Sequence, residues 1–280
     1  MDTFHTTTPP HAPAPSQPKP PGVRTDDRCT LERITHIHHW TERLLSFRCT
    51  RYRGFRFAPG QFARLGLTDE DGHLVWRAFS MVSAPYDDYL EFLAIIVPDG
   101  AFTRQLAKLG EGDTLQVDKT AYGFLTTDRF RDGEDLWLLA TGTGLAPFLS
   151  ILRDPDTWTR YRHVILAHSV RTEAELAYRD SALGLRDHPL LGDAAERLVY
   201  LPIVTREDTP RAVAHQRISA LLGSGALAAH AGLTLAPGPS RIMICGNPEM
   251  LRDTRNQLKS MGFSLSRRER PGHYAVENAF

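Results

Sequence analysis

The feature that most constrains the fold is a change of sequence pattern near the middle of the chain. Before residue 120, short strand-like runs are separated by turn residues, as in 74–82, 90–97 and 114–117. Such spacing is typical of an antiparallel barrel or sandwich. After residue 132, apolar runs alternate with helical segments, and this alternation predicts a parallel sheet covered by helices. The strand–helix pairs are 136–140 with 146–152, 164–167 with 174–183, 198–204 with 218–222, and 242–245 with 249–261.

We therefore predict a two-domain fold class, in which an antiparallel β-barrel domain precedes an α/β domain with a Rossmann-like parallel sheet. The predicted divisions are a Pro-rich tail at 1–24, expected to be disordered, a barrel domain at 25–131 and the α/β domain at 132–280. A short helix at 102–109, ended by Gly110, is expected within the barrel.

Composition narrows the classes of partner. Lys plus Arg and Asp plus Glu are equal at 33 each, so no general attraction to nucleic acid or an anionic membrane is expected. No apolar run reaches the roughly 18 residues of a membrane-spanning helix. The three cysteines, Cys29, Cys49 and Cys245, are too few and too far apart for a disulfide framework or a four-cysteine iron–sulfur centre. We expect a cytoplasmic protein.

Two histidines of an expected strand, His36 and His38, share one face, and His39 follows them. No third ligand at a recognised spacing accompanies them, so surface or packing roles are favoured and no metal is predicted.

A glycine turn follows the first strand of the second half, at Thr141-Gly142-Thr143-Gly144-Leu145. In a parallel sheet, such a turn lets backbone N–H groups approach a pyrophosphate at the start of the next helix. The run is not the full dinucleotide fingerprint, so an ordinary small-residue turn remains an open alternative for Thr143 and Gly144.

The next strand ends at Ser169 and Arg171, where a fold that prefers NAD would be expected to carry an acidic residue. A guanidinium donates paired, charge-assisted hydrogen bonds to a phosphate, so these residues favour NADP. Arg206, after the third strand, could close the same pocket. Solvated arginines at loop ends remain the alternative.

Two segments of the first half suit a ligand with both a ring and a phosphate. Arg77 and Phe79 lie on one face of a strand, and the run from Gly100 to Thr103 opens the short helix. Strand packing for Phe79 and an ordinary helix start remain open alternatives.

Together these segments resemble the plant-type ferredoxin–NADP reductase superfamily, and most closely its bacterial branch, from about residue 28 to 280. Arg77-Ala78-Phe79-Ser80 resembles the family's Arg-x-Tyr-Ser flavin motif, and residues 142–148 resemble its nicotinamide-nucleotide loop. The run from Cys245 to Met250 resembles the Cys-Gly-x-x-x-Met signature.

The resemblance implies an FAD-dependent enzyme that exchanges electrons between NADPH and a transiently bound ferredoxin or flavodoxin. Flavin suits this conversion because it accepts a hydride and releases single electrons. The resemblance also implies tuning roles at the reaction centre for Ser80, Cys245 and Glu277. Implied contacts with FAD or NADP come from Arg77, Ala78, Phe79, Ser80, Ala94, Ile95, Ile96, Gly100, Ala101, Phe102, Thr103, Thr143, Gly144, Ser169, Arg171, Arg206, Arg217, Ala279 and Phe280.

Two departures from the family pattern carry consequences. Phe79 replaces the usual tyrosine, which keeps a stacking face but removes a phenolic hydrogen bond. In bacterial members the terminal Ala-Phe pair precedes a short extension, whereas this sequence ends at Phe280.

The acceptor is expected to be a separate protein, because the chain has no cysteine cluster. The segment 43–68 carries six arginines and no Asp or Glu, so we expect part of it to dock an acidic carrier; solvated arginines are the alternative. The six are Arg43, Arg48, Arg51, Arg53, Arg56 and Arg64. A flavin or quinone reductase of the same superfamily, and a non-catalytic FAD-binding module, remain alternative functions.

Overall fold

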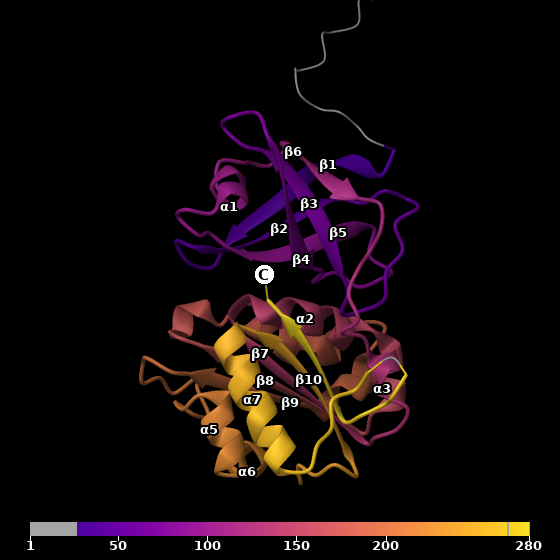
Figure 1. Ribbon diagram of the computed structural model, residues 1–280, viewed down its shortest axis with the longest axis vertical. Helices are drawn as coiled ribbons and strands as arrows, with labels where there is room; N and C mark the ends of the chain where they lie inside the picture. Colours follow the sequence, from indigo (N-terminus) through magenta and orange to yellow (C-terminus); the bar gives the residue numbers. More distant parts are fainter. Residues whose placement is uncertain (1–26, 268, 280) are drawn as a thin grey trace, which may run out of the picture.

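The computed structural model describes residues 27–267 and 269–279. The tail predicted at 1–24 and the contact predicted for Phe280 lie outside the described residues. The described residues form two sheets, which lie one above the other in Figure 1. We call strands β1–β6 with helix α1 the barrel half, and strands β7–β11 with their helices the parallel-sheet half.

The barrel half is a six-stranded sheet in the order β4-β3-β6-β1-β2-β5, with every neighbouring pair antiparallel. A bridge between Met81 and Phe92 brings the two ends of this order together, so the sheet curls into the expected antiparallel barrel. Its strands are β1 (Cys29–His39), β2 (Leu44–Thr50), β3 (Phe62–Thr68), β4 (Leu74–Ser80), β5 (Tyr89–Ile95) and β6 (Thr114–Asp118).

Burial of large apolar side chains holds the barrel together. Phe47, Phe92 and Leu65 are each almost fully buried inside it, and each such side chain contributes roughly 2 kcal/mol when removed from water. The short helix expected within the barrel is α1 (Ala101–Leu106), which packs on this core through Phe102 and Leu106.

The parallel-sheet half contains five strands in the order β11-β10-β7-β8-β9, all parallel, as the alternating sequence pattern predicts. They are β7 (Asp135–Thr141), β8 (His163–Val170), β9 (Leu198–Val204), β10 (Ser240–Gly246) and β11 (Tyr274–Asn278). The central strand β7 is buried on both faces, because Leu138 and Trp137 point into two different cores.

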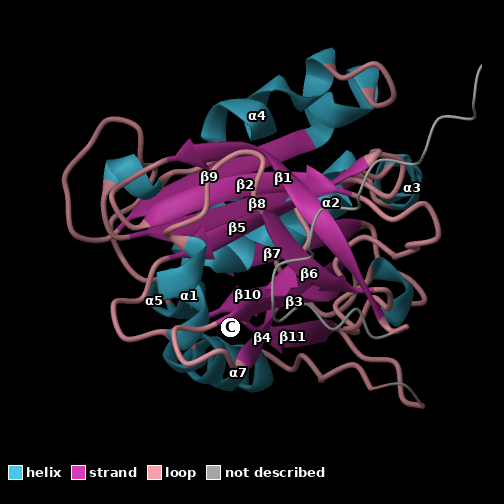
Figure 2. Cartoon of the chain, turned by 90° about the horizontal axis from the view of Figure 1, so that it is seen from above, coloured by secondary structure: helices cyan, strands magenta, loops and turns pink. Residues whose placement is uncertain are grey.

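Helices cover both faces of this sheet, as the view in Figure 2 shows. One face carries α2 (Ala146–Arg153), α3 (Pro155–Arg160) and α4 (Arg179–Leu183); the other carries α5 (Ile218–Gly223), α6 (Ala226–Ala231) and α7 (Pro248–Ser260). Short 3₁₀ turns are η1 (Thr127–Arg129), η2 (Gly142–Leu145), η3 (Glu173–Glu175), η4 (Gly184–Asp187) and η5 (Gly192–Arg197).

The continuous helix predicted at 174–183 is wrong. The segment is the turn η3 followed by α4, and the two are separated by Tyr178, whose backbone is left-handed at φ 58°. The carboxylate of Glu175 accepts from the backbone N–H of Arg171 at 2.8 Å, so it serves the end of β8 and not a helix cap. By contrast, Asn247 caps α7, and its side-chain oxygen accepts from the N–H of Met250 at 2.9 Å.

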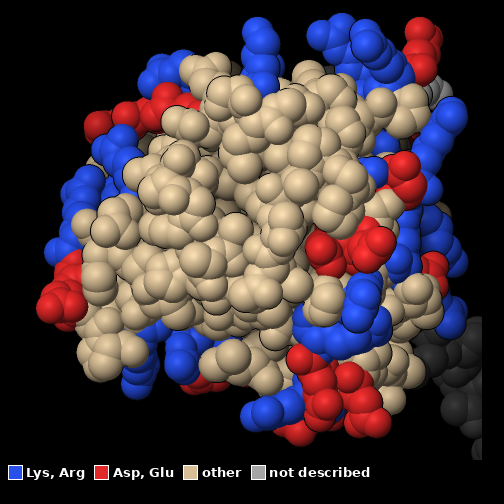
Figure 3. Space-filling model, turned by 90° about the horizontal axis from the view of Figure 1, so that it is seen from below, with Lys and Arg blue, Asp and Glu red and all other residues tan. Residues whose placement is uncertain are grey.

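The described residues include no helix that is long and apolar enough to cross a membrane. The end of the parallel-sheet half that faces away from the barrel is shown in Figure 3, with charged side chains gathered at its margin around an uncharged centre. Helices α5 and α6 lie at this end (Figure 1), within a segment, 218–240, that contains no Lys, Arg, Asp or Glu.

Candidate active site

Three residues that the sequence predicted at a reaction centre come together where the two halves meet. Parallel pairing of β10 with β11 places Cys245 directly beside Glu277. Ser80, the last residue of β4 in the barrel half, lies close enough to the Glu277 carboxyl for its hydroxyl to favour the charged form of that carboxyl. We call Ser80, Cys245 and Glu277 the reaction corner.

Two glycines allow the strand ends at this corner to approach each other. A Cβ on Gly144 would lie 2.3 Å from the carbonyl oxygen of Cys245, and one on Gly246 would lie against the Thr141 hydroxyl. A side chain at Gly144 would therefore push η2 away from the end of β10, and one at Gly246 would push away the end of β7. The Thr141 hydroxyl also accepts from the backbone N–H of Asn247 at 3.1 Å, which ties the two strand ends together.

Burial changes the acid–base behaviour of Glu277. It raises the pKa of this carboxyl to about 7, and the nearby Ser80 hydroxyl opposes part of the rise. The Oε1 atom is buried and has no hydrogen-bond partner among the described residues. Gly123 lies against the other oxygen, because a Cβ there would be 3.1 Å from Oε2.

Cys245 is not prepared to act as a nucleophile. Burial and, secondarily, the neighbouring charge of Glu277 raise the pKa of its thiol. A thiolate is the reactive form of cysteine, so this thiol remains protonated at neutral pH. Its contribution at the corner is a small, neutral wall.

On the barrel side, the corner continues into the predicted flavin motif. Arg77 is exposed, whereas Phe79 is half-buried, with its ring centroid 5.3 Å from that of Phe102 in the barrel core. Ala78, between them, is also half-buried. An exposed guanidinium, a firmly seated ring and the unpartnered oxygen of Glu277 fit a ligand with a phosphate, an aromatic system and a hydrogen-bonding edge.

The predicted contacts around α1 differ in what they can offer a ligand. Ala94 and Phe102 are buried in the core, so only their backbone can face outward. Ile95 is exposed, while Ile96, Gly100 and Ala101 are half-buried. The hydroxyl of Thr103 donates to the Val97 carbonyl at 3.0 Å and accepts from the Val97 N–H at 3.1 Å, so it already holds the preceding turn.

The predicted phosphate-binding arginines lie at the ends of β8 and β9. Arg171 and Arg206 are exposed, and the N–H of Arg206 donates to the carbonyl of Arg171 at 2.9 Å. Neither side chain has an ion-pair partner within the described ranges. Ser169 is buried at the end of β8. Arg217, before α5, is instead paired with Glu249 at 2.8 Å.

The remaining predicted contacts lie close to the corner. Thr143 is half-buried in η2, and Gly144 is buried beside it. Ala279 is half-buried, and its N–H donates to the carbonyl of Gly246 at 2.9 Å. Sequence reasoning did not reveal the contacts of Thr141 with Asn247 or of Gly123 with Glu277, because these contacts depend on strand ends and a loop that meet only in the folded chain.

The arginine segment is less available than predicted. The Arg51 guanidinium donates to the carbonyls of Pro85, Asp87 and Phe55 at 2.6–2.9 Å, so this side chain is engaged within the barrel half. That part of the segment docks a carrier stays a prediction. Arg48 lies 3.5 Å from Glu91, and its guanidinium covers the ring of Tyr89.

The other four arginines of this segment are exposed. Arg56 donates to backbone carbonyls, and Arg64 lies over the ring of Trp76. Arg43 and Arg53 make no side-chain contact of this kind with the described residues.

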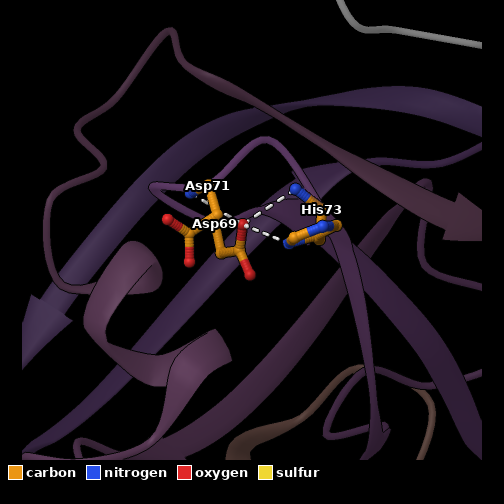
Figure 4. Close-up of side chains that lie close together, drawn as sticks. All are labelled: Asp69, Asp71 and His73. Atoms are coloured by element: carbon orange, nitrogen blue, oxygen red, sulfur yellow. Dashed lines mark hydrogen bonds and ion pairs between the residues drawn. The ribbon is translucent and has the colours of Figure 1, made fainter.

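An acidic group at the β3–β4 turn has a local structural role. Oδ1 of Asp69 accepts from the backbone N–H groups of Asp71 at 3.0 Å and of His73 at 2.8 Å (Figure 4). The two histidines considered from sequence have separate partners: His36 lies 3.2 Å from Glu111, and His38 packs against Trp40. That the protein binds no metal stays a prediction.

Comparisons with known proteins agree with this geometry. Residues 28–124 match the oxidoreductase FAD-binding domain family, and residues 138–256 match the oxidoreductase NAD-binding domain family. A ferredoxin–NADP reductase of Pseudomonas aeruginosa is 45% identical over 253 residues, which cover 89% of this chain and 96% of the relative. A flavodoxin/ferredoxin–NADP reductase of Rhodobacter capsulatus is 37% identical, covering 88% of this chain and 92% of the relative.

A solved structure gives the same result. The ferredoxin NADP+ reductase of Neisseria gonorrhoeae, with bound FAD and NADP, superimposes with a TM-score of 0.84 at 40% identity. The match covers 91% of this chain and 100% of that one. The resemblance found in the sequence motifs is confirmed, and the chain belongs to the ferredoxin–NADP reductase family.

Proposed function

We propose that this protein exchanges electrons between NADPH and a one-electron carrier, ferredoxin or flavodoxin, through bound FAD. The observation that carries the proposal is the pairing of Cys245 with Glu277 at the end of β10, together with the nearness of that carboxyl to Gly123 and to Ser80 of the flavin motif in the barrel half. The names of the relatives and the FAD and NADP of the gonococcal structure support the same activity. We retain 25–131 and 132–280 as the proposed domains.

The residues on the barrel side fit FAD. Arg77 would pair with its pyrophosphate and Phe79 would lie against its ring, while the Ser80 hydroxyl would face the polar edge of the ring. Bound flavin supplies the conversion between a two-electron hydride and single electrons. The segment from Ala94 to Ile96 and the turn before α1 would line the remainder of the cofactor, mainly through backbone groups.

The chain's own contribution is position and proton control. Gly144 and Gly246 hold the strand ends close, so that a nicotinamide placed beside Cys245 meets the flavin motif in one fixed arrangement. With a pKa of about 7, Glu277 holds a proton at its carboxyl in part of the population at neutral pH and releases it in the rest. Ser80 and Glu277 can therefore pass a proton at the edge of the flavin site.

The exposed arginines favour NADP over NAD. Arg171 and Arg206 are joined through their backbones, and their charges are not neutralised by an ion pair with any described residue. A 2′-phosphate would supply that missing negative charge, and Arg217 would join them by leaving Glu249. Binding of NADPH is therefore expected to depend on these side chains.

Stopped-flow reduction of the purified protein tests the proposal. We expect flavin absorbance that bleaches quickly with NADPH and slowly with NADH under anaerobic conditions, followed by electron transfer to added ferredoxin or flavodoxin. The proposal would be contradicted if the protein did not take up FAD. It would also be contradicted if the bound flavin stayed oxidised after NADPH was added.

The encounter with the carrier is proposed to be transient and electrostatic. After the internal contacts of Arg51 and Arg48 are set aside, Arg43 and Arg53 are the arginines of the segment best able to attract an acidic surface. We also propose a cytoplasmic location, because Cys49 and Cys245 are buried cysteines outside any disulfide.

A further inference from the structure

A buried carboxylate joins the two halves at a distance from the reaction corner. Glu91 of β5 is only 4% exposed. Its Oε1 accepts from the hydroxyl of Tyr178 at 2.9 Å, and its Oε2 accepts from the guanidinium of Arg153 at 3.3 Å. Both donors belong to the parallel-sheet half, so a single side chain of the barrel half receives two bonds from the opposite half.

Hydrogen bonds between side chains and backbone groups also connect the two halves in this region. The Arg153 guanidinium also donates to the carbonyl of Val82 at 3.1 Å. The hydroxyl of Ser150, one turn earlier in α2, donates to the carbonyl of Ser83 at 2.8 Å. The Ser83 hydroxyl in turn accepts from the N–H of Glu91 at 3.2 Å. The bonds of Ser83 and Ser150 are buried and that of Arg153 is partly buried, so breaking one of them would leave a polar atom with little or no access to water.

The conformation of Tyr178 shows how strongly this contact is specified. It is the one residue other than glycine with a positive φ in the part of the chain that the structure describes. A left-handed backbone is unfavourable for a bulky residue and persists where surrounding contacts determine it. Here the ring lies 4.9 Å from that of Trp40 in the barrel half, and the hydroxyl reaches Glu91.

The connected segments lead directly to the reaction corner. Val82 and Ser83 follow Ser80 in the chain by two and three residues. Helix α2, which carries Ser150 and Arg153, begins immediately after the turn η2 that contains Gly144. The buried contacts therefore join the segment after the flavin motif to the helix after the nucleotide loop.

We propose that Glu91, Arg153 and Tyr178 form an interdomain clamp that sets the distance and angle between nicotinamide and flavin. They are positioning residues, since none of them belongs to the reaction corner, and the inference rests on the proposed function. A shift of about 1 Å between reacting groups can lower a rate roughly a hundredfold, so a small change at the clamp has a measurable effect on hydride transfer.

The test compares two tyrosine variants that each remove one hydroxyl from the same interface. Tyr178→Phe keeps the ring against Trp40 and deletes the bond to Glu91. Tyr86→Phe is the matched control: the Tyr86 hydroxyl also crosses between the halves, to the carbonyl of Arg153 at 2.9 Å, but its residue is 44% exposed. FAD content and the thermal midpoint are measured for both proteins.

Anaerobic stopped-flow then separates binding from positioning. For Tyr178→Phe we expect the limiting rate of flavin bleaching by NADPH to fall about fivefold or more, with the Kd for NADPH changed less than about twofold. The long-wavelength charge-transfer absorbance, which requires contact between nicotinamide and flavin rings, should fall by about half or more, because it depends on ring geometry. A role in stability alone would lower the thermal midpoint without altering this absorbance. Tyr86→Phe should leave the rate and the absorbance unchanged.

Glu91→Gln provides the stronger variant, because it removes the charge that faces Arg153 and Arg48. If it folds, its limiting rate should fall further than that of Tyr178→Phe. An unchanged limiting rate and charge-transfer absorbance in Tyr178→Phe, or equal losses in Tyr86→Phe, would overturn the clamp while leaving the proposed function intact. Wild-type flavin that NADPH does not bleach would overturn the proposed function and the clamp with it.

Discussion

The reaction corner differs in construction from another part of the same sheet, the ends of β8 and β9 that carry Arg171 and Arg206. We call this second region the arginine edge. At the ends of β7, β10 and β11, the backbone is packed closely around Gly144 and Gly246, and burial shifts the pKa of Glu277. At the ends of β8 and β9, Arg171 and Arg206 are exposed. The first region is shaped before any ligand arrives, whereas the second holds charge that is screened by water until a phosphate binds.

This contrast predicts that backbone changes at the corner have the largest effect. Gly144→Ala would place a Cβ 2.3 Å from the carbonyl oxygen of Cys245 and 2.7 Å from the nitrogen of Gly246. We expect the rate of flavin reduction by NADPH to fall about a hundredfold, because η2 must move. Stopped-flow absorbance measures this rate, and urea unfolding should show a loss of about 2 kcal/mol.

Gly184→Ala is the matched control for that variant. Gly184 belongs to the same half and has no positive φ, and a Cβ added there would meet no atom within 4 Å. The rate and the unfolding free energy should be unchanged. Equal losses in both variants would mean that the corner is no more tightly constrained than a surface turn.

The next effect in size is expected at the arginine edge. Arg171→Ala removes a charge-assisted contact to the 2′-phosphate, which is worth about 2 kcal/mol, so the KM for NADPH should rise about twentyfold. The KM for NADH and the limiting rate should stay constant, because this residue does not shape the corner. Steady-state kinetics with NADPH and with NADH measures the ratio of the two KM values in the wild-type protein and in the variant.

Arg186→Ala is the control for nucleotide selectivity, since Arg186 is an exposed arginine on the turn η4 of the same half. It should leave both KM values unaltered. If Arg171→Ala raised the KM for NADH as much as that for NADPH, the assignment of a 2′-phosphate site would be incorrect.

Glu277 gives the corner a pH dependence that the arginine edge lacks. The folded-state pKa of about 7 lies above the ordinary 4.5, so the folded protein retains a proton that the unfolded chain releases. The associated stability is fully present below about pH 4.5 and is lost as pH rises through about 7. Relative to Glu277→Gln, the wild-type protein should lose on the order of 2 kcal/mol of unfolding free energy across that window.

Glu277→Gln should also change the activity of the enzyme and its dependence on pH. Carrier-coupled turnover of Glu277→Gln should fall about tenfold at pH 7, and its pH profile should lose the inflection near 7, because the amide cannot transfer a proton. Denaturant titrations and turnover at matched pH values measure both effects. A wild-type inflection that persists in the variant would assign the titration to another group.

The sequence predicts a region well where the interacting residues are close together along the chain, and poorly where they are far apart along the chain. The motif around Ser80 and the run Cys245-Gly246 are contiguous, so their strand and turn context can be read locally. The approach of Gly123 to Glu277 cannot be read in this way, since it depends on an inter-strand loop that meets β11 only after both halves fold.

Loop chemistry also limited prediction at the arginine edge. Thr172 and Glu175 have the spacing of a capping box, but Glu175 bonds the N–H of Arg171 and the left-handed Tyr178 interrupts the helix. The interdomain contact with Glu91 accounts for this, because tertiary contacts override local propensity where they are buried. Similarly, an arginine-rich sequence does not distinguish Arg51, bonded to three carbonyls, from Arg53, which is exposed.

The smallest expected effect concerns the encounter with the carrier. Arg53→Glu reverses an exposed charge, and it should lower the association rate with an acidic ferredoxin or flavodoxin about threefold at low salt, because such contacts steer the approach. The difference in association rate should vanish at high salt. The rate at which the enzyme uses NADPH to reduce a small oxidant such as ferricyanide should stay unchanged. Arg162→Glu, at an exposed position of the parallel-sheet half, serves as the control. If both reversals slow association equally, the effect reflects net charge, and the arginine segment of the barrel half is then no docking site.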